Sequence, residues 1–526
     1  MFDYKKIFIL SKKLLNRLVI NKIMIDYIGY IKNKNKNKNK NYLVVDYVSS
    51  FAVIVTYMHI FLESKKISKI YFTKTENFSK FDRLGILNIK FDFIYKNIMK
   101  HLGLKKWQLY KLNENEIDNI FNKLNAKDKL LNLYIQNIKV GDLIYNTYIR
   151  WSGEPTISLN SKLLRKIIYE AYQVYYYAID CFKNINIDEF KYIAGDTAYI
   201  YSGITARVAI DFGIKTYSIV ETEGLSIVEL KSPYYYRNHR YDNYLYEFSI
   251  FNKKKQAVSI AKSSYELKMF FNGLNTYSYM KKSSYSNLED KDILENEIKK
   301  YFQEKKVVLI MLHDFMDSPH LYKSMVYPDF YEWIISTLDY LKSKNIKAII
   351  KPHPNGLPEN KSIVDKLKSK YPYFYFLEDN TSNKTLLNIG IDFMITVYGS
   401  AGYEFAYHNV PVISAGDNPH ISFNFVKTCL TENNYFSTID KFINKKYYNI
   451  DKQEIHQFYY MHYLRKTKIN LISPIYPTEE FINYINDEIS DSYIIREKYA
   501  KTTDILYLDM QINRYDDKTV SDVLNV

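Results

Sequence analysis

Two kinds of hydrophobic pattern follow one another along the chain. In residues 4–31 the apolar side chains recur at a spacing close to 3.6 residues, with lysines on the other faces, which predicts an amphipathic helix. The alternating Lys-Asn stretch that ends at residue 41 has low complexity and repels itself, so we expect a solvated tether there. From residue 42 onward, short apolar runs alternate with helical patterns. This alternation predicts a parallel sheet with right-handed crossovers.

The first alternating series covers residues 42–272. NYLVVDYV and KISKIYFTK are expected strands, and the apolar stretch SSFAVIVTYMHIFLES between them is an expected helix. A second strand–helix–strand pattern begins at KYIAG, where we expect a strand that ends near Ala194. A helix then runs through Arg207, and Gly213 closes it before the strand KTYSIV.

A second alternating series follows a polar stretch at residues 273–304, which has little strand pattern and is expected to link two domains. Its expected helices are DFYEWIISTLDYLKSK and SIVDKLKSK. Its expected strands are KKVVLIMLH, KAIIK, FYFLE, IDFMITV and PVISAG. Such alternation favours a doubly wound domain.

The expected fold class is therefore α/β, with two Rossmann-like domains on either side of a deep cleft, an N-terminal basic helix and C-terminal helices that pack back across the cleft. The expected parts are 1–41 (helix and tether), 42–272 (first domain), 273–304 (linker), 305–435 (second domain) and 436–526 (helical region).

Charge and cysteine content narrow the functional class. The net charge is +15, but residues 1–41 alone carry +9, from eleven Lys or Arg and two Asp, so the basicity is mostly a local tail. Such a tail suits an anionic membrane surface, or else the helix packs on the body of the protein. Nucleic-acid binding is disfavoured because no recognised motif accompanies the charge. Two distant cysteines, Cys181 and Cys429, fit a reducing compartment.

No apolar run reaches 18 residues, and lysines interrupt every apolar stretch near the N-terminus. We therefore expect a cytoplasmic protein, peripheral on the inner face of the cytoplasmic membrane if residues 1–41 bind lipid.

The strongest candidate site is TVYGSAGYEFAYHNVPVISAG, residues 396–416. A buried strand ends at Val397, and the small residues Gly399, Ser400, Ala401 and Gly402 then open a helix. Ligands of open α/β sheets bind at this edge, where free backbone N–H groups and a helix dipole suit an anion. Glu404 lies in the first helical turn, in position to bond a ribose hydroxyl. Alternatively the glycines make a tight turn and Glu404 only balances the helix N-terminus.

A second candidate is Lys351-Pro352-His353-Pro354, at the end of the strand KAIIK. The prolines stop the strand and fix the backbone, which places a cation and an imidazole at the same kind of edge. Both groups suit a phosphate that gains negative charge as it leaves. The alternative is a surface turn with incidental basic residues.

These motifs, in this order and followed by Asn418-Pro419-His420, resemble the C-terminal domain of GT-B glycosyltransferases of bacterial capsule and surface-polysaccharide biosynthesis. VGDLIYNTYIR (140–150) and GDTAYIYSGITARVAIDFGI (195–214) are also similar to elements of that family. The resemblance covers roughly residues 42–430. Nucleotide-sugar 2-epimerases share similar turns, so the order of the motifs carries more weight than any single one.

The resemblance implies a nucleotide sugar held by the second domain and an acceptor glycan held by the first. Lys351, His353, Ser400 and the backbone beside it would then contact phosphates, and Glu404 the ribose. His313 and Asp314 would line the cleft, unless they simply cap the segment that follows them.

Acid–base chemistry is assigned to the first domain. Asp196, which follows the strand KYIAG, is the first choice for the base, and Asp142, Tyr199, Arg207 and Glu223 are candidates for the acceptor side. Glu221, like Glu223, is expected to face the cleft. The alternative for Asp142 is a structural role, as the anchor of the turn before LIYNTYIR. No Asp-x-Asp motif lies in a suitable place, so neither a metal nor another cofactor is expected, and protein cations would stabilise the leaving group.

The predicted activity is transfer of a sugar from a nucleotide sugar to a surface polysaccharide or lipid-linked glycan. Two alternatives stay open: a nucleotide-sugar 2-epimerase of the same fold, and a non-catalytic scaffold of polysaccharide assembly.

Overall fold

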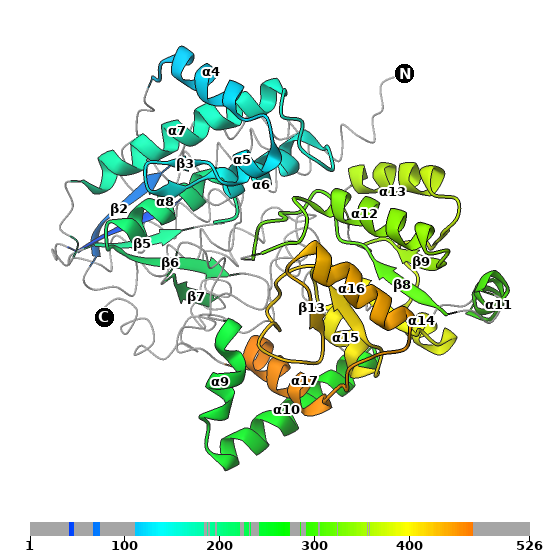
Figure 1. The fold of residues 1–526 in the computed structure, drawn as a ribbon. Helices are drawn as coiled ribbons and strands as arrows, with labels where there is room; N and C mark the ends of the chain where they lie inside the picture. The colour runs from blue at the N-terminus through cyan, green and yellow to red at the C-terminus, as the bar shows by residue number, and fades with distance from the viewer. Residues whose placement is uncertain are drawn as a thin grey trace, which may run out of the picture. The chain divides into compact units, whose positions relative to one another are not determined.

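The computed structural model describes residues 41–46, 67–73, 111–183, 187, 190–194, 197–220, 226–230, 232, 241–273, 285, 291–302, 306–322, 324–354, 356 and 358–465 (Figure 1). The expected helix at 4–31 and its tether, the apolar helix between the first two strands, and everything after residue 465 lie outside these residues. So do Asp196, Glu221 and Glu223. Within the described residues, no helix is both long enough and apolar enough to cross a membrane.

Contacts divide the chain into two compact units. Unit 1 comprises residues 1–114, 169–233 and 466–526, and unit 2 comprises residues 115–168 and 234–465. These bounds differ from the expected domain bounds, because residues 115–168 and 234–272 fall in unit 2 with the second alternating series. The expected bounds stay a prediction.

Unit 1 contains a five-stranded sheet in the order β2-β1-β5-β6-β7. Its strands are β1 (Asn41–Asp46), β2 (Ile67–Thr73), β5 (Phe190–Ala194), β6 (Lys215–Val220) and β7 (Ser226–Glu229). All neighbouring pairs are parallel except β6 and β7. Helix α8 (Ile200–Asp211) packs against β5 and β6, and Gly213 follows it with φ +76°, as the sequence predicted.

Helix α7 (Lys162–Phe182) supplies the aromatic packing of unit 1. The Phe182 ring lies edge-on to Tyr192 of β5, with ring centroids 5.6 Å apart. On the same helix, Glu170 accepts a hydrogen bond from the hydroxyl of Tyr201 in α8. Helices α7 and α8 are thereby tied to each other and to the sheet.

Unit 2 contains a six-stranded sheet in which every neighbouring pair is parallel, in the order β10-β9-β8-β11-β12-β13. The strands are β8 (Val308–Met311), β9 (Ala348–Lys351), β10 (Tyr375–Phe376), β11 (Phe393–Thr396), β12 (Val412–Ser414) and β13 (Lys427–Thr428). In chain order this is 3-2-1-4-5-6, the arrangement of Rossmann-like sheets. The expected α/β class is confirmed, and the strand order reverses between β8 and β11.

Helices cover both faces of this sheet. Alternate residues of each strand point to opposite sides, and in β8, β9 and β11 the residues on both sides are buried. Val308 and Ile310 pack with α12 (Phe330–Ser343), α13 (Pro358–Lys370) and α16 (Glu432–Ile443). Leu309 and Met311 pack with helices of the other face (Figure 1). These are α9 (Tyr244–Ser249), α10 (Lys253–Phe271), α11 (Lys291–Phe302), α14 (Asn383–Ile389), α15 (Ala401–Tyr407) and α17 (Lys452–Tyr459). α17 continues as a π-helical turn, Tyr460–Leu464.

Residues 115–168 add smaller elements to unit 2. They form α4 (Glu114–Lys123), α5 (Lys127–Leu131), the two-stranded sheet β3 (Tyr134–Ile135) and β4 (Ile138–Lys139), and α6 (Gly141–Ser152). The motif VGDLIYNTYIR is thus largely one buried helix, α6.

Candidate functional site

Three adjacent strands of unit 2 end in the residues that the sequence singled out. His353 follows β9, His313 follows β8, and Gly399 and Ser400 follow β11. The carboxyl ends of parallel strands meet at one edge of the sheet, and ligands bind beside the point where the strand order reverses. That point lies between β8 and β11, so the predicted donor-side residues gather at the expected edge.

The His313 ring is central to this edge. It stacks on Phe330 with ring centroids 4.3 Å apart, and it lies 5.8 Å from the His353 ring and 6.2 Å from the Tyr398 ring. Tyr398 in turn donates a hydrogen bond to the carbonyl of Pro319, 3.0 Å away, which ties the loop after β8 to the end of β11.

His353 is half-buried and uncharged at neutral pH. Burial lowers its pKa to about 4, helped by the charges of His313 and Lys351 and opposed by Asp317. A neutral imidazole donates one hydrogen bond. A bound phosphate would raise its pKa, because an anion favours the charged form.

The turn after β11 faces open space. Gly399 is exposed and has φ +107°, a backbone conformation that a side chain rarely adopts. A Cβ placed on Gly399 meets no atom within 4 Å. Ser400 and Ala401 are partly exposed beside it, so the backbone of this turn is accessible to a ligand. Helix α15, which follows, has only seven residues.

Lys351 and Glu404 lie behind the edge, in the interior. The ammonium of Lys351 donates to Asn383 Oδ1, and Glu404 Oε2 accepts from Asn383 Nδ2 at 3.3 Å and from the Tyr285 hydroxyl at 3.1 Å. Burial lowers the pKa of Lys351 to about 8, against the attraction of Glu404 and Asp379. Burial also raises the pKa of Glu404, although hydrogen bonds from Ser400 and Tyr285 oppose the shift.

Asp314 makes the contact of a local cap. It is buried, and its Oδ1 accepts from the backbone N–H of Met316 at 2.9 Å. This matches the capping alternative for Asp314. A role in ligand binding stays a prediction.

The candidates for the acceptor side fall in different units. Tyr199 precedes α8 and Arg207 is buried within it, both in unit 1. Asp142 lies in the first turn of α6 in unit 2, where its charge acts on His320 of the loop after β8. Burial lowers the pKa of His320 to about 4, and Asp142 opposes that shift.

Sequence reasoning missed Asp329, Asn383 and Tyr285. Asp329 caps α12 through a 2.8 Å bond from the N–H of Glu332 to Oδ1. Its Oδ2 accepts from the hydroxyls of Tyr145 and Thr156, both at 2.6 Å. The Asp-x-x-Glu spacing at the start of α12 signals the cap. No sequence signal predicts the bonds from residues 145 and 156.

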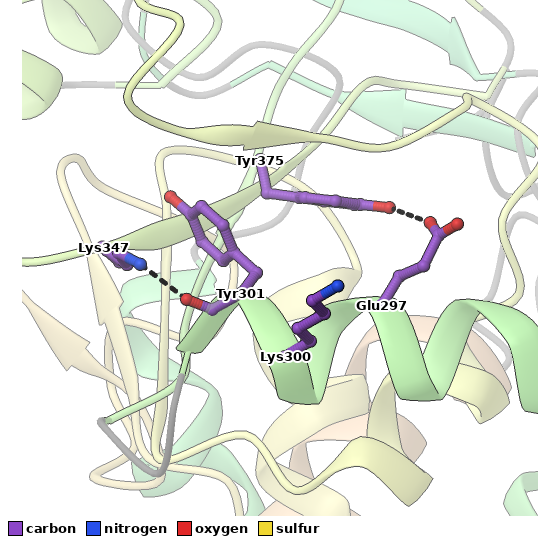
Figure 2. A pocket seen from close by; sticks show the side chains of 5 residues that line it. All are labelled: Glu297, Lys300, Tyr301, Lys347 and Tyr375. Carbon is purple, nitrogen blue, oxygen red and sulfur yellow. Dashed lines mark hydrogen bonds between the residues drawn. The ribbon is translucent and has the colours of Figure 1, made fainter.

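A shallow hollow of about 440 Å³ lies at the opposite, amino edge of the sheet, lined by Glu297, Lys300, Tyr301, Lys347 and Tyr375 (Figure 2). Its polar groups largely bond to one another. The Lys347 ammonium donates to the Tyr301 carbonyl at 2.6 Å, and the Tyr375 hydroxyl donates to Glu297 at 2.9 Å. None of the predicted site residues lines this hollow.

No family model matches the sequence, and no curated protein matches it. Among solved structures, the chain is similar to the KpsC beta Kdo 2,4 transferase of Thermosulfurimonas dismutans, at 13% identity over 51% of this chain and 78% of that chain, with a TM-score of 0.32. It is also similar to a glycosyltransferase of Rickettsia africae, at 10% identity over 89% and 100%, with a TM-score of 0.26. A third similar structure is the UDP-GlcNAc 2-epimerase of Neisseria meningitidis, at 11% identity over 80% and 97%, with a TM-score of 0.24.

These similar structures include both transferases and an epimerase, so they do not choose between the two activities. At TM-scores well below 0.5 they carry no weight for the reaction.

Proposed function

We propose that the chain is a glycosyltransferase of the surface-polysaccharide type, which binds a nucleotide-sugar donor at the carboxyl edge of the unit 2 sheet. One observation carries the proposal. Three adjacent strands beside the reversal point end in His353, His313 and the open Gly399–Ser400 turn. Sheets with this strand order bind nucleotides at that point.

The chemistry of these groups suits a diphosphate or monophosphate leaving group. A hydroxyl of the acceptor attacks the anomeric carbon, the bond from that carbon to the phosphate oxygen breaks, and the phosphate keeps the electron pair. Asp196, the proposed base, would take the proton of the acceptor hydroxyl, and His353 would donate a hydrogen bond to the phosphate oxygen as that oxygen becomes anionic. His313 and the backbone N–H groups near Ser400 would hold the remaining phosphate oxygens.

The acceptor side rests on the sequence resemblance. In the family that the chain resembles, the first Rossmann-like domain holds the acceptor across a cleft, and we assign that role to residues 42–272. Asp196 remains the proposed base, with Tyr199, Arg207 and Glu223 as acceptor contacts. A glycan or glycolipid would be the acceptor, and residues 1–41 would keep the enzyme near an anionic membrane.

The decisive experiment measures thermal unfolding of the full chain with CMP, CDP, UDP or GDP. A nucleotide present at about 100 times its dissociation constant should add roughly 2.7 kcal/mol of stability. The variant His353→Ala should lose that shift. The matched control is His456→Ala, because His456 is also half-buried in unit 2 but lies on α17, 5.9 Å from the Tyr407 ring.

If no nucleotide shifts the folded wild type, the donor site is wrong and the scaffold alternative takes its place. If UDP shifts it, incubation with UDP-GlcNAc separates the two enzymes. Conversion of the sugar at C2 without an acceptor would identify an epimerase, and release of nucleotide only when a glycan acceptor is added would identify a transferase.

A further inference from the structure

A buried polar network lies directly behind the carboxyl edge of unit 2. It consists of Lys351 at the end of β9, Asn383 at the start of α14, Glu404 in α15, and Tyr285. Each of the four is at most 3% exposed. We call it the Lys351 network. Charged groups so deeply buried persist only when they are paired and hydrogen-bonded.

The Asn383 amide joins the two charges of the network. Its oxygen accepts from the Lys351 ammonium, and its nitrogen donates to Glu404 Oε2 at 3.3 Å. The Tyr285 hydroxyl donates to the same oxygen at 3.1 Å. Tyr285 is held by ring contacts with Phe270 and Phe271 of α10, at 5.5 and 4.9 Å.

The network connects two turns that come from strands on either side of β8. Lys351 lies two residues before His353, and the backbone N–H of Glu404 donates to the Ser400 carbonyl at 3.1 Å. Since β9 and β11 flank β8 in the sheet, no strand ladder joins these two turns directly. The buried side chains supply a direct link between them.

We propose that Lys351 is a positioning residue, whose ammonium stays bonded within the Lys351 network and sets the spacing of the His353 turn and the Gly399–Ser400 turn. The proposal rests on the proposed function, because these two turns are the ones that would hold the donor phosphates. Asn383, Glu404 and Tyr285 share this role. The groups that would contact the donor phosphates are His353, His313 and backbone N–H groups.

The alternative is direct contact between Lys351 and a phosphate. Variants that remove one or both of the charges of Lys351 and Glu404 distinguish these two roles. If Lys351 acts through Glu404, Lys351→Met leaves an uncompensated buried carboxylate, and Glu404→Gln leaves an uncompensated ammonium. The double variant Lys351→Met/Glu404→Gln has neither. If Lys351 binds phosphate itself, removing Glu404 as well restores nothing.

The test measures, by calorimetric titration of the full chain, the dissociation constant of whichever of CMP, CDP, UDP and GDP binds the wild type. We expect each single variant to bind about tenfold more weakly or worse, and the double variant to recover to within about threefold of wild type, as coupled sites do. A double variant as weak as Lys351→Met would overturn the positioning role. Lys347→Met, just before the first residue of the same strand, is the matched control and should bind as the wild type does.

A milder variant covers the case in which the charge variants do not fold. Tyr285→Phe keeps both charges and removes only a hydroxyl that is buried with its ring, so it acts on the donor site only through the rest of the Lys351 network. We expect about threefold weaker nucleotide binding, on the order of one lost hydrogen bond. Unchanged affinity in a folded Tyr285→Phe protein would overturn the inference. Wild-type protein that binds none of the four nucleotides would instead refute the proposed function itself.

Discussion

The two ends of strand β9 place similar lysines in opposite surroundings. Lys347, just before the strand, is half-buried, bonds a backbone carbonyl and lies 4.4 Å from the Tyr301 ring centroid (Figure 2). Lys351, the last residue of the strand, is 2% exposed and bonds an amide beside a buried carboxylate. The lysine charge at the amino edge therefore lies near the surface, whereas the lysine charge at the carboxyl edge is buried.

The difference shows where the fold accepts a thermodynamic penalty. A buried ion pair is often no more stabilising than apolar side chains of similar volume, so stability alone does not explain Lys351 and Glu404. A role in holding the two turns of the candidate donor site in place would explain why these two charges are buried directly behind that site. The amino edge, with its shallow hollow, shows no such internal charge among the residues that line it.

The largest expected effect is on folding stability at the two ends of β9. Lys351→Met should lower the free energy of unfolding by about 3–5 kcal/mol, because it leaves the Glu404 carboxylate buried without its cation. Lys347→Met should lower it by less than about 1 kcal/mol, as for other partly exposed charges. Urea denaturation of both variants measures the difference. Equal losses would mean that the buried charges of Lys351 and Glu404 do not stabilise each other.

Five of the six strands of the large unit 2 sheet, β8 to β12, and helices α12, α13 and α15 were predictable from the sequence. Parallel strands that are buried on both faces read as continuous apolar runs, and AIIK and FMIT are β9 and β11. The turn at Gly399 was also predictable, since glycine adopts a positive φ without strain, which a tight turn directly after a buried strand requires. These features depend on neighbours within a few residues.

The network and the Asp329 contacts were not predictable, because their partners are distant in sequence. Tyr285 bonds a carboxylate 119 residues later, and Tyr145 bonds one 184 residues later. No local pattern marks such pairs. Burial of Lys351 was missed for a similar reason. An apolar strand that ends in lysine is expected to reach the surface, whereas the Lys351 ammonium is buried and bonds Asn383 of α14, 32 residues later.

The second largest expected effect is a pH dependence of folding stability that comes from a histidine near the carboxyl edge. His420, 3% exposed near the carboxyl edge, packs against Phe425 and Phe458 with ring centroids 5.5 and 5.8 Å apart. Burial lowers its pKa to about 3, so between pH 6.5 and that value the unfolded chain binds the proton more readily than the folded chain does. Stability should therefore fall as the pH falls.

The expected loss from His420 is about 1.6 kcal/mol between pH 6.5 and pH 5, because the slope rises from half of 1.36 kcal/mol per pH unit at pH 6.5 to nearly the full value at pH 5. Urea denaturation of wild type and His420→Gln at both pH values isolates the contribution of His420, because the variant keeps every other titrating group. The variant should lose about that much less than wild type. Parallel curves for the two proteins would show that His420 already accepts a proton in the fold.

The smallest effect belongs to the amino edge. Tyr375→Phe removes a 2.9 Å hydrogen bond to the exposed carboxylate of Glu297 while it keeps the ring beside Tyr301. Water replaces such a partner readily, so the free energy of unfolding should change by no more than about 0.5 kcal/mol. Nucleotide affinity should not change, in contrast to Tyr285→Phe at the other edge. If Tyr375→Phe weakened nucleotide binding as much as Tyr285→Phe, the two edges would not be functionally distinct, and the hollow of Figure 2 would have to be part of the donor site.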